Sequence, residues 1–182
     1  MAESEKNLPV SLSPHIETGI FSELFGVVIA DPVALERFHH HSVVGSNLLD
    51  LYTQTDEGEK ISEAGVAIPI LGIEAGYYSV TFRNFSETIK LLTKPIATST
   101  GWILHVVSGS VAVCGIGYLS NWNPQHEAVR HFNIPKGWYS VEIHLGAPIN
   151  DDDFLLEIIL SPSSGKPEFT ANMDKTLLEN GI

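Results

Sequence analysis

The stretch Trp138-Tyr-Ser-Val-Glu-Ile-His-Leu145 decides the fold class, because apolar and polar side chains alternate along it. One face begins at Tyr139 and is apolar throughout, whereas Glu142 and His144 mark the opposite face. A period of two is typical of a β-strand that buries one face and exposes the other. The stretch therefore predicts a half-buried strand.

The same periodicity extends over most of the chain. Residues Tyr77–Arg83 alternate in the same way, and four further segments are apolar on both faces, as expected of strands in the middle of a sheet. These four are Phe25–Ala30, Trp102–Val107, Ser110–Cys114 and Phe154–Leu160. The dipeptide Ser108-Gly109 suits a tight hairpin between the second and third of them. We therefore predict a mainly β protein, either a β-sandwich or a barrel.

Helical signals are few. Asp31 is a candidate N-cap, and Pro32 follows it in the first turn of a short helix that would reach Phe38. Residues Ser86–Leu92 could form a helical turn or a strand. The prediction is thus one or two short helices beside the strands.

Two segments of the chain resemble each other. Ile73–Phe82 aligns with Ile134–Ile143, with Gly, Tyr, Ser and Val at identical spacing behind an Ile. The match predicts an internal duplication with halves at about 20–92 and 100–161. The halves would stack sheet on sheet and bury Tyr78 and Tyr139 between them.

The domain organisation follows from this repeat. A single β domain is expected over residues 15–161, with tails at 1–14 and 162–182. The first half is longer than the second, which places an insertion within residues 35–65. Long insertions on a rigid scaffold often carry function.

Charge limits the partners. The 182 residues include 22 Asp and Glu against 10 Lys and Arg, a formal net charge of -12. Such a surface repels phosphate backbones and anionic membranes, so neither nucleic acid nor membrane is expected as a partner. A cationic protein, by contrast, would be attracted and steered in.

The single cysteine cannot form an internal disulfide, which favours a reducing compartment. Cys114 lies in an apolar segment, where burial should raise the pKa of its thiol and leave it unreactive. The first residues lack the features of a signal peptide, and no apolar stretch is long enough to span a bilayer. These observations predict a soluble, cytoplasmic protein.

Acidic runs are the candidate partner-binding residues. They could dock a cationic protein, or could serve only to solvate the surface and protect a sheet edge. Trp122 lies in a polar loop and could be an aromatic anchor, or could fold back onto the core. The candidate set comprises Asp56, Glu57, Glu59, Glu63, Trp122, Asp151, Asp152 and Asp153.

The histidines allow a second hypothesis. A cupin-type metal site could be built from His105, His126 and His131, with Glu127 as the carboxylate. The cupin arrangement, however, places two histidines on one strand with a Glu soon after, and His105 has no such neighbours. The run at residues 39–41 is expected to be a surface loop. No catalytic serine elbow or phosphate loop is recognisable, so neither a cofactor nor a metal is expected.

Two short motifs resemble a known group of proteins. Gly26-Val-Val-Ile-Ala-Asp31-Pro32 and Phe132-Asn-Ile-Pro135-Lys-Gly137-Trp-Tyr139-Ser-Val141 are similar to segments of small bacterial β-sandwich families. These include immunity proteins of toxin systems and competence-associated nuclease inhibitors. The resemblance implies a non-enzymatic protein that neutralises a toxin or nuclease, and it transfers no catalytic residue. The alternatives are a cupin-like metal-dependent enzyme and a structural or oligomer-forming β domain. The oligomeric state stays open.

Overall fold

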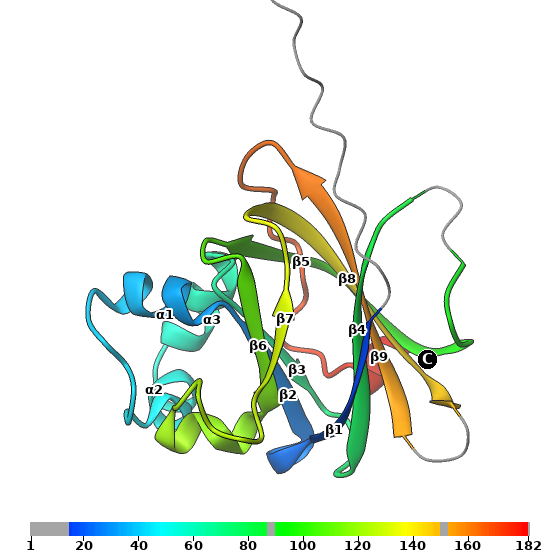
Figure 1. The fold of residues 1–182 in the computed structure, drawn as a ribbon, viewed down its shortest axis with the longest axis horizontal. Helices are drawn as coiled ribbons and strands as arrows, with labels where there is room; N and C mark the ends of the chain where they lie inside the picture. The colour runs from blue at the N-terminus through cyan, green and yellow to red at the C-terminus, as the bar shows by residue number, and fades with distance from the viewer. Residues whose placement is uncertain (1–14, 87–89, 150–152, 182) are drawn as a thin grey trace, which may run out of the picture.

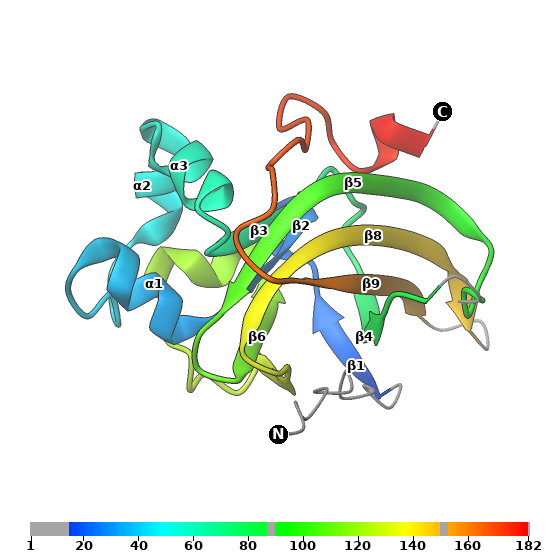
Figure 2. The ribbon, with the colours of Figure 1, turned by 90° about the horizontal axis from the view of Figure 1, so that it is seen from above.

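The computed structural model describes residues 15–86, 90–149 and 153–181, which form two packed β-sheets with helices beside the smaller one (Figures 1 and 2). The larger sheet has the strand order β1-β4-β9-β8-β5, and the smaller has the order β3-β2-β6-β7. The mainly β prediction is confirmed, in its sandwich form. The strands are β1 Ile16–Phe21, β2 Gly26–Ala30, β3 Ala67–Leu71, β4 Tyr77–Asn84, β5 Pro95–Val106, β6 Ser110–Gly115, β7 Arg130–Asn133, β8 Gly137–Ile149 and β9 Asp153–Ser163.

The main core lies between the two sheets, and strand alternation fills it. In β2, Val27 and Ile29 point into this core, whereas Val28 and Ala30 point to the helices on the other side. In β8, the apolar face that begins at Tyr139 is buried in the same core. Because both faces of β2 are covered, its side chains are apolar without alternation.

The two similar segments occupy matching places in one sheet. β4 and β8 flank β9, instead of lying in opposite sheets as predicted. Tyr78 and Tyr139 are both buried in the main core, and each hydroxyl donates to the backbone carbonyl four residues earlier, at 2.9 and 2.7 Å. Each half thus contributes strands to both sheets, because a sequence match does not specify which sheet a strand joins. The duplication itself stays a prediction.

The predicted hairpin between β5 and β6 is wrong. These strands belong to different sheets, so the Ser108-Gly109 turn carries the chain from one sheet to the other. The carboxylate of Asp31 holds this turn, because it accepts hydrogen bonds from the backbone N–H of Val107 at 2.8 Å and of Ser108 at 2.7 Å.

β5 lies at an edge of the larger sheet, although its apolar sequence predicted a central strand. Other segments cover this edge: Gly65 O accepts from His105 N at 2.7 Å, and Gly101 O accepts from the N–H groups of residues 170 and 171. The C-terminal segment, expected to be a tail, continues from there across the sandwich. Leu177 is only 3% exposed, and its N–H donates to Leu71 O.

The helical layer contains the predicted helix and two others. In α1, Pro32–His39, Asp31 caps the first turn as expected. The insertion forms α2, Leu48–Gln54, and α3, Glu57–Glu63, which were not predicted because each is only seven residues long. Short 3-10 turns are η1 Glu23–Phe25, η2 Ile116–Asn121 and η3 Leu178–Gly181.

Two sequence predictions fall partly or wholly outside the described residues. The tail at 1–14 lies outside them, as do residues 87–89 of the Ser86–Leu92 segment. The described flanks of that segment lie in neither a helix nor a strand. In the part of the chain that the structure describes, no helix has the length and apolar character needed to cross a membrane.

Candidate functional site

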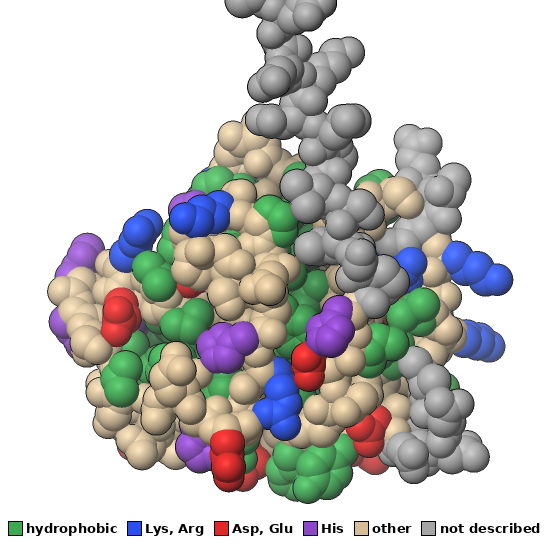
Figure 3. Space-filling view, in the orientation of Figure 1, with side chains coloured by type: hydrophobic (Ala, Val, Ile, Leu, Met, Phe, Trp, Pro, Cys, Tyr) green, Lys and Arg blue, Asp and Glu red, His purple; other side chains and the backbone are tan. Residues whose placement is uncertain are grey.

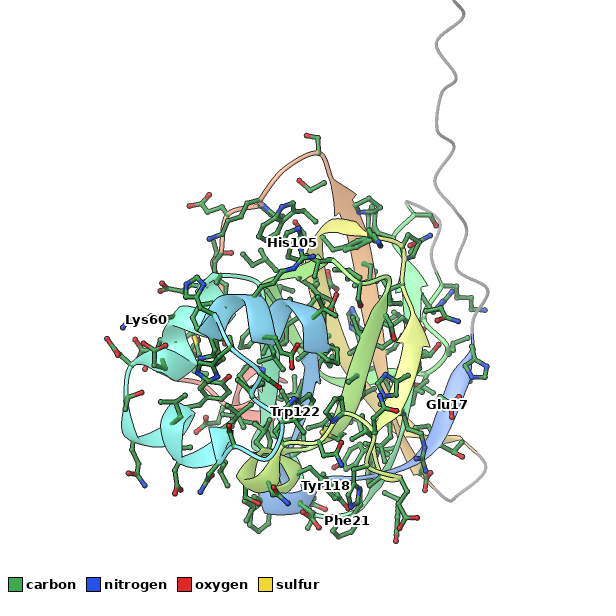
Figure 4. The ribbon with its side chains drawn as sticks, turned by 60° about the vertical axis from the view of Figure 1, so that its left-hand side comes forward. Glu17, Phe21, Lys60, His105, Tyr118 and Trp122 are labelled. Carbon is green, nitrogen blue, oxygen red and sulfur yellow. The ribbon has the colours of Figure 1, made fainter. Side chains whose placement is uncertain are left out.

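The acidic residues of the insertion lie on and beside α3, on the surface of the helical layer. Lys60 is labelled there in Figure 4, and its Nζ lies 3.0 Å from Asp56 Oδ1 and 2.9 Å from Glu57 Oε1. Exposed pairs of this kind contribute little to stability. Glu59 and Glu63 are exposed and form no ion pair among the described residues, so this surface carries four carboxylates and one ammonium group. The surface therefore remains strongly negative.

The structure does not bring the second acidic run to this surface. Asp151 and Asp152 lie outside the described residues. Asp153 begins β9, and that end of the strand lies at the opposite end of the molecule from α3 in both ribbon views (Figures 1 and 2). Asp153 is thus far from the acidic residues of the insertion, and one partner surface of ordinary size would not contain both.

Trp122 takes the second of the two roles that the sequence left open. Its side chain is 1% exposed and packs in the core beneath the helices (Figure 4). Its backbone N–H donates to Ser46 O at 3.0 Å, and its carbonyl accepts from Gly45 N at 2.7 Å. Trp122 therefore joins the insertion to η2. Because its side chain is buried, it is not a partner-binding residue.

The candidate metal ligands are engaged elsewhere. The His105 ring stacks on Trp138, with ring centroids 4.0 Å apart. His126 packs against Tyr118, and His131 Nε2 lies 2.8 Å from Pro124 O. Within residues 15–86, 90–149 and 153–181, no three His, Cys, Asp or Glu side chains converge as a metal ion would require. Burial raises the pKa of Cys114 to about 12, so its thiol stays protonated, as predicted.

One member of the histidine run packs against the insertion. His39 Nε2 lies 2.7 Å from the Tyr52 hydroxyl, and the two rings are stacked. Burial, and then the neighbouring His41, hold the pKa of His39 below its usual value. Burial also raises the pKa of Tyr52, with a further contribution from the Glu57 carboxylate. Both rings are therefore neutral near pH 7. The contact that joins α1 to the insertion is thus a hydrogen bond between two uncharged side chains.

This contact gives the protein a pH dependence. The unfolded chain binds a proton at residue 39 more readily than the folded chain. Stability therefore falls as the pH drops below the ordinary histidine pKa, and the loss levels off once the pH is below the lowered pKa of His39. We expect urea unfolding to show lower stability at about pH 5 than at about pH 8, and a smaller difference in the His39→Gln variant. His131→Gln is the control, because His131 is exposed and lies outside the insertion. An unchanged pH difference in His39→Gln would contradict the assignment.

A further surface, which the sequence analysis did not identify, lies between β1 and β2. Four large apolar side chains are exposed here: Phe21 at 37%, Leu24 at 60%, Phe25 at 62% and Tyr77 at 59%. The rings of Phe21 and Tyr77 are in contact, with centroids 5.1 Å apart. We call these four residues the apolar tip. Figure 3 shows green side chains gathered at the lower edge of the molecule over this segment.

The backbone of the apolar tip is strained. Leu24 and Phe25 have φ angles of 54° and 58°, in the left-handed region that bulky residues rarely adopt. The end of β6 and the start of η2 pack closely against this segment: a side chain at Gly115 would collide with Phe21 O, and one at Gly117 with Glu23. The Gly115-x-Gly117 pattern thus makes room for the tip. Strain kept at an exposed apolar site indicates a functional constraint.

Negative charge surrounds the apolar tip. Figure 3 shows acidic side chains on both sides of the green group. Tyr118 lies at the same end of the molecule as Phe21 (Figure 4), and its pKa is raised by burial first, and then by Glu23 and other neighbours. Beside the tip is a shallow hollow of about 420 Å³, lined by residues 21–25, Leu49, Ala75, Gly117 and Ser120. Aromatic side chains within a charged rim are typical of protein-binding surfaces.

Fold and surface define the class: a two-sheet β protein with a helical insertion and an acid-flanked apolar tip. No protein-family model and no curated protein matches the sequence. One similar solved structure is ComJ from Bacillus subtilis, an inhibitor of the DNA-degrading activity of NucA. Its TM-score is 0.47 and its identity 15%, over 84% of this chain and 97% of ComJ.

The sequence motifs resemble nuclease-inhibitor families, and ComJ is a protein of that kind. A second similar structure is the product of crocagin biosynthetic gene J, with a TM-score of 0.50 and 13% identity. The match covers 81% of this chain and 98% of that one. This likeness concerns the fold alone.

Proposed function

We propose that the protein is a non-enzymatic binding module that inhibits a cationic partner protein, such as a basic bacterial toxin or nuclease, in the bacterial cytoplasm. The resemblance of its sequence motifs to immunity and nuclease-inhibitor families favours this role. The net charge of -12 favours a cationic partner, since opposite charge speeds encounter and excludes acidic competitors.

The apolar tip is the observation that carries the proposal. Leu24 and Phe25 are more than half exposed, in a backbone conformation that costs free energy in the isolated protein. A partner that buries these side chains would recover the hydrophobic stabilisation that the free protein lacks. The tip is therefore the proposed anchor of the complex.

The acidic residues have a different proposed role. Asp56, Glu57, Glu59 and Glu63 on the insertion, together with Asp151, Asp152 and Asp153, are proposed to steer the partner towards the complex. Exposed charges act mainly on the association rate, whereas buried anchors act mainly on dissociation. The two groups of residues can therefore be separated kinetically.

The direct test is inhibition by the purified protein. The tagged chain would be crosslinked in an extract of its own host, with a Phe25→Ser variant as the matched negative. A protein enriched only by the wild type would then be purified and its activity titrated. We expect a basic protein whose activity is abolished at stoichiometric amounts. Full activity at saturation, or an acidic partner, would refute the proposal.

The steering role predicts a change in association kinetics. Neutralising Asp56, Glu57 and Glu59 together should lower the association rate about tenfold at low salt and remove most of its salt dependence. The control is the same charge change at Glu142, Glu168 and Asp174, which lie outside the insertion. Stopped-flow association at several salt concentrations measures both. If both triple variants lowered the association rate equally, steering would depend on the net charge of the protein and not on the acidic residues of the insertion.

The strain at the apolar tip predicts opposite effects on stability and binding. Leu24→Gly should raise the free energy of unfolding by about 1 kcal/mol, because glycine adopts the left-handed backbone without strain. The same change should speed dissociation of the partner at least about tenfold, since an anchor is lost. Urea unfolding and dissociation kinetics test the two parts.

The control for this variant is Val44→Gly. Val44 is 54% exposed but lies outside the left-handed region, so its replacement should slightly destabilise the fold and leave binding unchanged. A Leu24→Gly variant that binds like the wild type would exclude the tip from the interface. A dimer that dissociates on this substitution would favour the oligomer-forming alternative.

A further inference from the structure

We propose that the cleft between the insertion helices and the smaller sheet binds a compact hydrophobic amine. The cleft has a volume of about 280 Å³, close to the lower end of the range for small-molecule sites. None of the four apolar-tip residues lines it, although Leu49 also lines the hollow beside the tip. The proposal does not depend on the proposed function.

The floor of the cleft is the outer face of β2 and β3. Val28 and Ala30 of β2 line it, together with Ala67 and Pro69 of β3. Ala30 and Ala67 are directly paired across the two strands, so two methyl groups stand side by side where larger side chains would fill the space. The inward faces of the same strands carry valine and isoleucine, which fill the main core.

The walls come from α2, α3 and η2. They include Leu49 and Tyr52 of α2, Ile61 of α3 and Leu119 of η2. Both helices are short, and α2 packs on η2 and α3. They therefore surround the alanine floor without filling it. Protein interiors rarely keep voids much larger than a water molecule, so a space of this size with apolar walls fits an organic ligand.

The polar groups of the cleft are hydrogen-bond acceptors. The hydroxyl hydrogens of Thr53, Thr55 and Ser62 are already donated to backbone carbonyls of their own helices, which leaves only oxygen lone pairs for a ligand. The Tyr52 hydroxyl shares a hydrogen bond with His39 Nε2. A lining of this kind selects a ligand that donates hydrogen bonds.

Glu59 adds a negative charge at the edge of the cleft. The neighbouring ammonium of Lys60 is held by Asp56 and Glu57, and the Glu59 carboxylate has no ion-pair partner among the described residues. An alkylammonium group carries three donors and a positive charge, and so complements both the carboxylate and the hydroxyl oxygens. The apolar body of the same molecule would rest on the alanine floor.

The test compares three probes of the same ring and different charge: tryptamine, tryptophol and indole-3-acetate. Binding to the full chain would be measured by calorimetry and by NMR chemical shifts of the cleft residues. We expect tryptamine to bind at least about tenfold more tightly than tryptophol, in keeping with a charge-assisted hydrogen bond. Indole-3-acetate should bind most weakly.

Three variants and a control locate the site. Ala67→Leu should abolish binding of tryptamine and tryptophol by filling the floor, and Leu49→Trp should do the same from the wall if the first variant fails to fold. Glu59→Gln should reduce tryptamine binding to the level of tryptophol and leave tryptophol unchanged. Glu63→Gln is the matched control, because Glu63 lies on the same helix but outside the cleft.

Each remaining outcome would overturn the proposal. Absence of binding by all three probes would show that the cleft is not a ligand site. Equal binding of tryptamine and indole-3-acetate would show that the site does not select a positive charge. Binding that is retained in both Ala67→Leu and Leu49→Trp would show that the ligand binds outside the cleft. Because no partner protein is used, these results are independent of the inhibition experiment.

Discussion

Replacing Asp31 with alanine is expected to lower the free energy of unfolding by about 3–5 kcal/mol. The carboxylate is fully buried and accepts four backbone hydrogen bonds. Oδ1 accepts from Val33 N at 2.9 Å and Ala34 N at 3.4 Å, and Oδ2 accepts from Val107 N and Ser108 N. Alanine would therefore remove a helix cap and leave the turn between the sheets with unsatisfied donors. Urea unfolding measures the loss.

Two variants separate these contributions. Asp31→Asn keeps the oxygen that caps α1 but replaces the second acceptor with an amide, so an intermediate loss is expected. Asn47→Ala removes an exposed cap, whose side chain accepts only from Asp50 N, and should cost about 1 kcal/mol. If Asp31→Ala cost no more than Asn47→Ala, the connection to the β5–β6 turn would contribute nothing.

A second large loss of stability is expected for Glu157→Ala. Glu157 lies in the middle of β9 and is 1% exposed. Its carboxylate forms an ion pair with Arg83, whose side chain is 18% exposed, and accepts from Leu92 N at 3.2 Å. Removing one partner of a buried pair leaves the other charge uncompensated, at a cost of about 3–5 kcal/mol. Urea or thermal unfolding measures this loss.

The matching double variant tests the cause. Glu157→Leu combined with Arg83→Met removes both charges, and should recover most of the stability lost in Glu157→Ala. Glu142→Ala is the control, since Glu142 is 42% exposed and its pair with His144 should contribute no more than about 1 kcal/mol. A double variant as unstable as Glu157→Ala would show that shape, and not an unpaired charge, causes the loss.

Much of the strand structure was predictable because alternation reports burial directly. The alternating face from Tyr139 to Leu145 enters the core as expected, and Asp31 caps the only helix with a clear sequence pattern. The charged pair at Glu157 was not foreseen, because a single Glu within an apolar strand carries no sign of its partner. Arg83 lies 74 residues away and meets it only through the parallel pairing of β4 and β9.

The candidate sites were less predictable. The acidic residues of α3 are exposed, as a run of like charges suggests, but their role in binding stays a prediction. Trp122 was ambiguous because an aromatic residue in a polar loop can point either way, and here the insertion covers it. The one local sign of the apolar tip was the pair Leu24-Phe25 between two strands. Its exposure depends on η2, about 90 residues later in the sequence.

The sequence by itself determined that this is a mainly extended, acidic chain with two similar strand segments, because side-chain periodicity and charge are local properties. Only the tertiary structure decided which strands share a sheet, that the turn after β5 crosses between sheets, and that Asp153 lies far from the acidic residues of the insertion. It also decided where the apolar tip and the alanine-floored cleft lie. Those features arise from contacts between residues far apart in the chain, which no short segment of sequence contains.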